Sequence, residues 1–200
     1  MINLWILLLL FVSCTSSQLT PDPWSEIKTP LPGPAQSLGG YNAGCLKGAV
    51  ALPSEGKGFQ AVRISRRRFY GHPTLKDFIL HLSQTTYQKK FGTLLIGDMG
   101  QPRGGPITGG HASHQTGLDV DLWFQSAEDL KKGPMDLNDR ENLSAQNVVT
   151  LDGKGLNPQF WGDKQRKLLR LIAEDPTVER AFIDAAIKMD LCQKFKGQPW

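Results

Sequence analysis

The chain has 200 residues, of which 40% are hydrophobic, and a formal net charge of +4. This length and apolar content suffice for one compact domain with a hydrophobic core, and they exclude a chain that is disordered throughout. The 21 glycines and 13 prolines exclude an all-helical protein and favour many loops and short strands. We therefore expect an α+β fold with a small, largely antiparallel sheet, flanking helices and long loops.

Residues 1–17 have the pattern of a secretory signal peptide. Their apolar stretch runs from Leu4 to Val12 and is too short for a membrane-spanning helix, which needs roughly 20 apolar residues. Cys14 follows this stretch, so a lipoprotein signal with a lipidated Cys14 is the alternative to ordinary cleavage near residue 17. Both routes predict export, and lipidation of Cys14 would be the only membrane attachment.

The next segment, residues 18–40, contains five prolines and is predicted to be an extended arm on the surface. Residues 41–200 then form the folded domain. A helix is predicted near residues 75–83, because apolar residues recur there at helical spacing and Thr74 is placed to cap it. A second helix is predicted over residues 164–173.

A glycine-rich loop separates two predicted strands. TLLIGD, residues 93–98, is a short apolar run bounded by glycines and is predicted to be a buried strand. The loop that follows lacks the Lys-Ser/Thr ending of a phosphate-binding P-loop. In LDVDLWF, residues 118–124, apolar residues alternate with Asp119, Asp121 and Trp123, which predicts a half-buried strand of the central sheet.

Asp119 and Asp121 are expected to lie on one face of this strand. Acidic residues are poor strand formers, so two of them on one face favour cation binding, with simple exposure to water as the alternative. Two of the chain's four histidines, His111 and His114, precede them, and Gly117 allows the chain to turn. Imidazole nitrogens and carboxylate oxygens are usual zinc ligands. We therefore predict a zinc site, although iron or manganese would accept similar ligands.

Four arginines are concentrated in RISRRRFYGHP, namely Arg63, Arg66, Arg67 and Arg68. Their charge suits an anionic partner. No aromatic-interleaved RNA motif or helix-turn-helix pattern accompanies them, so we expect no nucleic-acid partner. For an exported protein, an anionic cell-wall polymer is the expected partner. A charged strand edge that resists pairing is the alternative.

Cys45 and Cys192 would lie in an oxidising compartment, where disulfides persist. The two cysteines could pair with each other, or each could pair with a cysteine beyond residue 200, because sequence alone does not fix connectivity. A reactive thiol is the least favoured interpretation, since neither cysteine lies beside a histidine or in a CxxC pattern.

Several motifs together resemble the penicillin-insensitive murein endopeptidases, which are zinc peptidases grouped with lysostaphin and the D-Ala-D-Ala carboxypeptidases. The motifs are GPAQSLGGYNAGCLKGA, RRRFYGHP, LIGDMG, GGHASHQTGLDVD and AAIKMDLCQKF. The similarity runs from about Trp24 to Trp200. Its most specific feature is a histidine followed seven residues later by an aspartate within SHQTGLDVD.

The resemblance implies a periplasmic zinc hydrolase that cuts the D-alanyl to meso-diaminopimelyl crosslink of peptidoglycan without an acylable serine. His114 and Asp121 match two metal ligands, and His111 matches a histidine of the site. Asp119 would orient a ligand through a hydrogen bond. A second metal position of the family uses an Asp-x-x-His pair, for which LDGKGL offers Asp152 with glycine in place of the histidine.

The resemblance further implies a histidine-rich strand after the residues that match FKGQPW. That strand would supply the third zinc ligand, the catalytic histidine and the disulfide partners of Cys45 and Cys192. The chain ends at Trp200, so we expect no catalytic residue within it and a zinc peptidase domain, residues 41–200, that is C-terminally incomplete. The expected function is a zinc-dependent murein endopeptidase. The alternative is an inert truncated remnant that only binds the cell wall.

Overall fold

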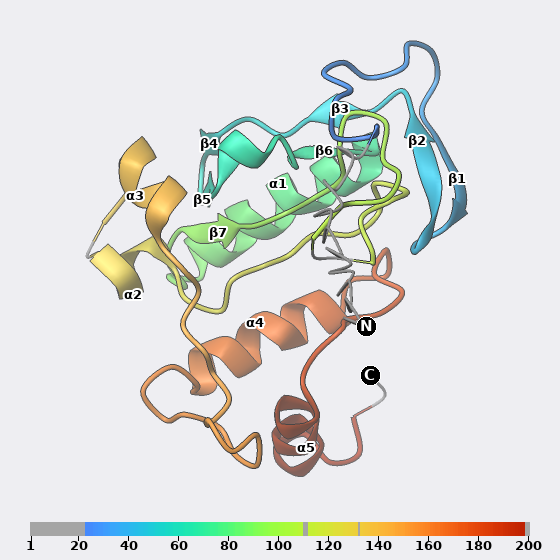
Figure 1. Ribbon diagram of the computed structural model, residues 1–200. Coiled ribbons are helices and arrows are strands. Elements are labelled where there is room, and N and C mark those ends of the chain that lie inside the picture. Colours follow the sequence, from blue (N-terminus) through green and yellow to red (C-terminus); the bar gives the residue numbers. More distant parts are fainter. Residues whose placement is uncertain (1–22, 110–111, 132, 199–200) are drawn as a thin grey trace, which may run out of the picture.

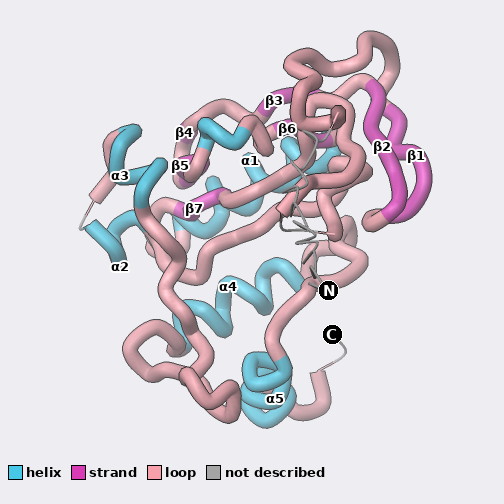
Figure 2. The backbone as a smooth tube through the Cα atoms, viewed as in Figure 1, coloured by secondary structure: helices cyan, strands magenta, loops and turns pink. Residues whose placement is uncertain are grey.

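The computed structural model describes residues 23–109, 112–131 and 133–198. The predicted signal peptide with Cys14, and also His111, lie outside these described residues. In the described part, short strands and 5 α-helices are joined by long loops (Figure 1). Figure 2 shows that loops and turns account for much of the backbone. The predicted α+β class is thereby confirmed.

The strands form three small sheets in place of the one central sheet that was predicted. β1 pairs antiparallel with β2, β3 pairs antiparallel with β6, and β5 lies between an antiparallel β4 and a parallel β7. Each described strand has at most 5 residues, which leaves little length for a continuous sheet. The strands are β1 Gln36–Gly40, β2 Ala43–Lys47, β3 Val50–Ala51, β4 Glu55–Gly56, β5 Phe59–Ala61, β6 Tyr70–Gly71 and β7 Leu94–Ile96.

The parallel strands β5 and β7 are connected through helix α1, Pro73–Gln88. The helix covers the predicted range, and its buried residues are Leu75, Ile79, Leu82, Ser83 and Thr86. Its N-cap is His72, whose Nδ1 accepts a hydrogen bond from the Thr74 N–H at 3.3 Å. The prediction that Thr74 caps the helix is therefore wrong, because Pro73 occupies the first helical position, where its missing N–H costs nothing.

The remaining helices are α2 Ala127–Lys131, α3 Leu137–Asn142, α4 Asp163–Ala173 and α5 Ala185–Lys194. A 3₁₀ turn, η1, covers Ile64–Arg66. α4 confirms the second predicted helix and packs against α1 through an apolar face that includes Leu168 and Ile172. Figure 1 shows α4 and α5 below β7 and α1. Among the described helices, none has the length and apolar character to cross a membrane.

Two hydrophobic clusters meet at β7. The larger cluster includes Leu94 and Ile96 together with residues of α1, α4 and α5. The smaller one surrounds Leu95 and includes Val62 and Trp123. Successive side chains of a strand point to opposite faces, so β7 is covered on both sides. This confirms the buried strand predicted at TLLIGD.

Asp190 fastens α5 to α4. Its carboxylate accepts hydrogen bonds from Arg166 Nε at 2.6 Å, from Arg166 Nη2 at 2.9 Å and from Trp161 Nε1 at 2.9 Å. The hydrogen bond from Arg166 lowers the pKa of Asp190, burial opposes this change, and the bond from Trp161 adds to it. The charged form of Asp190 is therefore favoured in the folded protein.

We expect Asp190→Asn to lower the free energy of unfolding at neutral pH by about 1.5–3 kcal/mol, the usual range for hydrogen bonds to a charged group. A carboxylate whose pKa is lowered by folding stabilises the protein above its unfolded pKa of about 3.9, and that contribution is lost as pH falls through the lower folded pKa. Urea unfolding from pH 7 down to pH 2.5 should therefore show the two proteins converging in acid. The exposed Asp77→Asn is the control, and a gap that stayed constant with pH would contradict the prediction.

Candidate metal centre

The backbone on both sides of His114 packs so closely that side chains are excluded at several positions. Gly104 has a φ of +64°, and a Cβ there would lie 1.9 Å from the carbonyl oxygen of Gln115. Gly117 has a φ of +67°, and a Cβ there would lie 2.3 Å from Leu46 Cδ2. Only glycine combines a left-handed backbone with such contacts. These glycines therefore allow close backbone packing around His114.

Gln115 ties this loop to the β1–β2 hairpin. Its buried side chain accepts a hydrogen bond from the Gly44 N–H at 3.1 Å and donates to the carbonyl oxygens of Asn42 at 2.9 Å and Ala112 at 3.1 Å. The Ser37 hydroxyl donates to the carbonyl oxygen of Thr116 at 2.8 Å. Gln115, the residue after His114, is thus hydrogen-bonded both to the hairpin and to its own loop.

The segment LDVDLWF runs antiparallel to β7 but forms a single bridge, between Leu122 and Ile96. The Asp121 N–H donates to the carbonyl of Asp98 at 2.9 Å, and the Asp121 carbonyl accepts from the Gly97 N–H at 2.8 Å. The predicted strand is therefore an extended segment with backbone pairing around Asp121. Its position is fixed by the buried end of β7.

The predicted burial pattern of this segment is partly wrong. Leu118 was expected inside, yet it is 53% exposed, because it precedes the paired part of the segment. Trp123 was expected outside, yet it is 9% exposed and packs in the smaller hydrophobic cluster. Val120 and Leu122 pack against the larger cluster. The segment is buried on two faces, whereas the alternation of apolar and polar residues assumes that only one face is buried.

His114 lies between the two aspartates of this segment. Its Nδ1 is 2.7 Å from Asp119 Oδ2, and its Nε2 is 3.4 Å from Asp121 Oδ1. The His114 N–H also donates to the Asp119 carboxylate, at 2.9 Å and 3.1 Å. His114 has a φ of +67°, a left-handed conformation that is strained for a residue with a Cβ. Asp119 thus holds both the backbone and the ring of His114.

The charges in this cluster depend on each other. Burial lowers the pKa of His114, but the hydrogen bonds and charges of Asp119 and Asp121 outweigh it and raise the pKa to about 10. Burial raises the pKa of Asp119, and the hydrogen bond from His114 outweighs that effect, so the net direction is down. His114 and Asp119 therefore form an ion pair at neutral pH. A cation that binds Nε2 displaces its proton, so acid opposes binding.

The spacing of His114 and Asp121 fits a shared zinc ion. Two ligands bound at about 2.0–2.2 Å with tetrahedral angles lie roughly 3.3–3.6 Å apart, which includes the observed 3.4 Å. The His114 side chain is 2% exposed and that of Asp121 is 40% exposed, so the shared position is open to solvent on the Asp121 side. The contact of Asp119 with Nδ1 selects the tautomer that leaves Nε2 for a metal.

The other predicted ligands are not brought to this pair. His111 lies outside the described residues, and within the described part no group of three His, Cys, Asp or Glu side chains could hold a metal ion. Asp152 is fully exposed and accepts hydrogen bonds from Thr150 Oγ1 at 2.6 Å and from the Lys154 N–H at 3.1 Å. These bonds form a local turn. Figure 1 shows the loop between α3 and α4 well separated from the segment that carries His114.

Asp98 is a buried carboxylate beside the centre that was not predicted from the sequence. Its Oδ2 accepts hydrogen bonds from Arg66 Nη1 at 3.1 Å and Arg68 Nη1 at 2.9 Å, and its side chain is 5% exposed. Two arginines of the basic run therefore pair with Asp98. One of them, Arg66, lies in the η1 turn and not in a strand. The available signal was an acidic residue two positions after the end of a buried strand.

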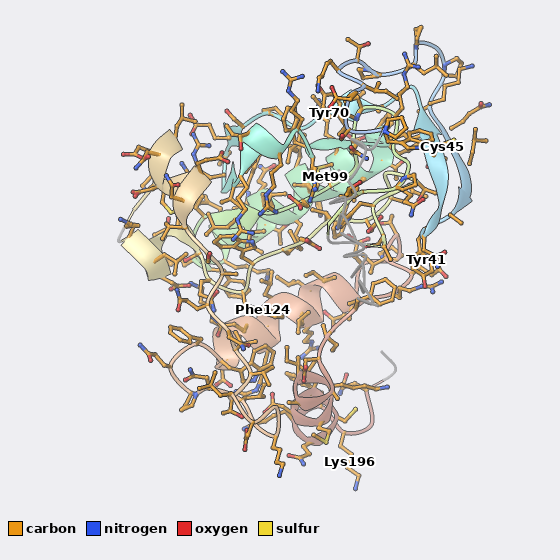
Figure 3. The ribbon with its side chains drawn as sticks, in the orientation of Figure 1. Tyr41, Cys45, Tyr70, Met99, Phe124 and Lys196 are labelled. Atoms are coloured by element: carbon orange, nitrogen blue, oxygen red, sulfur yellow. The ribbon has the colours of Figure 1, made fainter. Side chains whose placement is uncertain are left out.

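The two described cysteines do not form a disulfide with each other. Cys45 lies half-buried in β2, labelled in Figure 3, and Cys192 lies exposed in α5. Figure 1 shows β2 and α5 at opposite ends of the molecule. The interpretation in which Cys45 pairs with Cys192 is therefore wrong, and pairing with cysteines beyond residue 200 stays a prediction.

Comparisons with known proteins agree with the predicted resemblance. The chain is similar to murein endopeptidases named as penicillin-insensitive from Klebsiella pneumoniae, with 42% identity over 194 residues, and from Citrobacter koseri, with 44% identity over 186 residues. The protein of this name from Salmonella arizonae is 45% identical over 186 residues. These alignments cover 94%, 93% and 93% of the chain and 67%, 66% and 66% of the relatives.

The chain therefore spans about two thirds of the length of the curated relatives that it matches. A family model described as penicillin-insensitive murein endopeptidase matches residues 37–200, which include the segment with His114, Asp119 and Asp121. The match covers most of the chain and nearly all of the described fold. This chain belongs to the penicillin-insensitive murein endopeptidase family.

Proposed function

We propose that the chain forms part of a zinc-dependent endopeptidase that cuts peptide crosslinks of peptidoglycan in the periplasm. Family membership and the names of the relatives support the reaction class. The observation that supports the metal is the 3.4 Å separation of His114 Nε2 and Asp121 Oδ1, with Asp119 bound to the opposite ring nitrogen. This arrangement is typical of a histidine metal ligand oriented by a carboxylate.

The residues of the centre would each have a defined task. His114 and Asp121 would bind the ion through Nε2 and a carboxylate oxygen. Asp119 would hold the ring orientation and keep the remaining proton on Nδ1, where the 2.7 Å contact lies. When bound, zinc lowers the pKa of a coordinated water to about 7 and polarises the scissile carbonyl. The loop glycines would keep His114 in the left-handed conformation that this geometry needs.

We further propose that the scissile bond joins D-alanine to meso-diaminopimelate, the crosslink implied by the resemblance. Such crosslinked peptides carry carboxylates. Arg66 and Arg68 both bind the carboxylate of Asp98, and the backbone of Asp98 pairs with that of Asp121, so positive guanidinium charge lies beside the centre. Arg66 is 39% exposed, so this charge can attract an anionic substrate toward the centre.

A catalytic zinc ion usually has three protein ligands and an open position for water. His114 and Asp121 would be two of the three. His111 is one candidate for the third ligand, and the histidine-rich strand implied by the resemblance is the other. The same strand is our candidate source of the catalytic base.

The test compares the 200-residue chain with a chain extended after Trp200 by the corresponding strand of a relative. Crosslinked dimeric muropeptides are incubated with each protein, and dimers are separated from monomers by chromatography. We expect the extended chain to release monomers, a chelator to stop the reaction, and the 200-residue chain to be nearly inactive, because a positioned base typically contributes roughly 10²- to 10⁴-fold.

Asp121→Asn and His81→Ala serve as the paired variants of the extended chain. Asp121→Asn removes a proposed ligand and should abolish cleavage, whereas His81 is an exposed histidine of α1 and its loss should have little effect. Cleavage that survives Asp121→Asn would contradict the zinc mechanism. Binding of peptidoglycan without cleavage by the extended chain would favour the inert cell-wall-binding alternative.

A further inference from the structure

A cavity lies between the end of the Asp121 segment and the start of α4. Its volume is about 370 Å³, within the range of small-ligand sites. Gln125, Asp129, Gln159, Phe160, Trp161 and Gln165 are among its lining residues. Asp129 is 36% exposed, so the cavity reaches the surface there. Figure 3 labels Phe124, the residue before Gln125, beside α4.

Gln125 is the unusual residue of this cavity. The residue lines the cavity and is only 3% exposed, yet neither Nε2 nor Oε1 of its buried side chain has a hydrogen-bond partner within the described part of the chain. Buried side-chain amides are nearly always hydrogen-bonded, because leaving them without partners costs free energy. The amide of Gln125 therefore has unused capacity for one acceptor and two donor interactions.

Two neighbouring polar side chains, Gln165 and Asp129, already have partners. Gln165 Oε1 accepts from the Gly162 N–H at 3.0 Å, and Gln165 Nε2 donates to the Phe124 carbonyl at 3.3 Å. Asp129 accepts from the Ser126 N–H at 2.8 Å and from Lys164 Nζ at 2.6 Å. These bonds hold the walls in place. The Gln125 amide is thus the buried polar group of this cavity that has hydrogen-bonding capacity to spare.

We propose that this cavity binds a secondary amide that carries a methyl group. The amide of Gln125 can donate to the carbonyl or accept from the N–H of such a ligand, whereas a carboxylate offers acceptors only. The rings of Phe160 and Trp161 provide apolar wall for the methyl group. Both atoms of the Gln125 amide are covered in this structure, so the side chain turns toward the cavity when the ligand enters.

The cavity lies on the same backbone segment as the candidate metal centre. Gln125 follows Asp121 by four residues, so their Cα atoms are at most about 14 Å apart. Peptidoglycan offers the required chemistry in two forms, the N-acetyl group of its amino sugars and the alanyl amides of its peptides. Choosing peptidoglycan as the source rests on the proposed function, whereas recognition of a methyl-bearing amide does not.

The test is a binding titration of the 200-residue chain, followed by ¹H–¹⁵N NMR without zinc. N-acetylglucosamine and D-alanyl-D-alanine are the two probes, and glucose, which lacks an amide, is the control ligand. We expect one amide probe to shift the side-chain NH₂ signals of Gln125 and the indole signal of Trp161 in a saturable way. The probe that binds more tightly identifies the source of the amide.

Gln125→Met keeps the length of the side chain without its polar atoms, and we expect it to weaken binding about tenfold, as for the loss of one or two neutral hydrogen bonds. Gln84→Met, on the exposed surface of α1, is the matched control and should leave binding unchanged. The proposal is overturned if neither amide probe shifts Gln125, if glucose binds equally well, or if Gln125→Met retains full affinity. The wild-type titration decides the matter even if that variant fails to fold, and it is independent of any peptidase assay.

Discussion

His114→Ala is expected to eliminate measurable zinc binding at the candidate centre. The substitution removes Nε2, one of two described groups at the spacing of zinc ligands, and it also frees Asp119 from its 2.7 Å contact. Loss of an outer partner typically costs about 10- to 100-fold in metal affinity, and loss of a ligand costs more. Competition with a chromophoric chelator at fixed pH measures the dissociation constant for the wild type and each variant of the 200-residue chain.

The order of the variants is as informative as the loss itself. Asp121→Asn should weaken zinc binding by more than about 100-fold, and Asp119→Asn by about 10- to 100-fold, because Asp119 contacts the ring and not the proposed ion. His81→Ala is the control, and circular dichroism monitors the fold of every variant. Unchanged zinc affinity in His114→Ala would rule out this centre.

Gly104→Ala is expected to destabilise the fold more than Gly109→Ala or Gly133→Ala. The residue has a φ of +64°, and an added Cβ would meet the Gln115 carbonyl oxygen at 1.9 Å. The left-handed backbone alone costs about 1–2 kcal/mol with a side chain present, and the backbone must also move to relieve the overlap. We expect a loss of roughly 3 kcal/mol or more in the free energy of unfolding, measured with urea.

Two other glycines separate the causes of this loss. Gly109 has a φ of +79°, but no atom of the described residues lies within 4 Å of an added Cβ, so Gly109→Ala reports the backbone cost alone. Gly133 has neither a positive φ nor a close contact with the described residues, and Gly133→Ala should stay within about 0.5 kcal/mol of the wild type. Equal stabilities for the Gly104 and Gly109 variants would show that the contact with Gln115 does not constrain the loop. In the Gly104 variant we also expect weaker zinc binding, because Gln115 follows His114.

Local patterns predicted the regular elements well and their assembly poorly. The spacing around Ile79 identified α1, and the apolar run at Leu95 identified β7, because burial of one face leaves a periodic signal. The division into three sheets and the parallel pairing of β5 with β7 depend on contacts between residues far apart in sequence. No short-range pattern reports such contacts. The exposure of Leu118 and the burial of Trp123 have the same origin.

At the candidate centre, residue type and spacing led to His114, Asp119 and Asp121, and the structure places the three together. The sequence did not reveal that Asp119 would also bind the backbone N–H of His114. In that arrangement His114 has a left-handed backbone, which residue type does not predict for a histidine. The sequence also did not reveal Asp98, whose proximity to Asp121 results from antiparallel pairing between separate segments. Metal binding itself stays a prediction.

The pairing of the Asp121 segment with β7 determines how the centre can move. Its backbone hydrogen bonds end on Leu95, Gly97 and Asp98, at or next to a strand whose side chains are 0–3% exposed. A fluctuation that carried the backbone of Asp121 away from His114 would break these bonds and uncover that strand, so its free energy would approach that of opening the core. Asp121 therefore belongs to the rigid part of the molecule. Any motion that admits a bulky polymer must come from the surrounding loops.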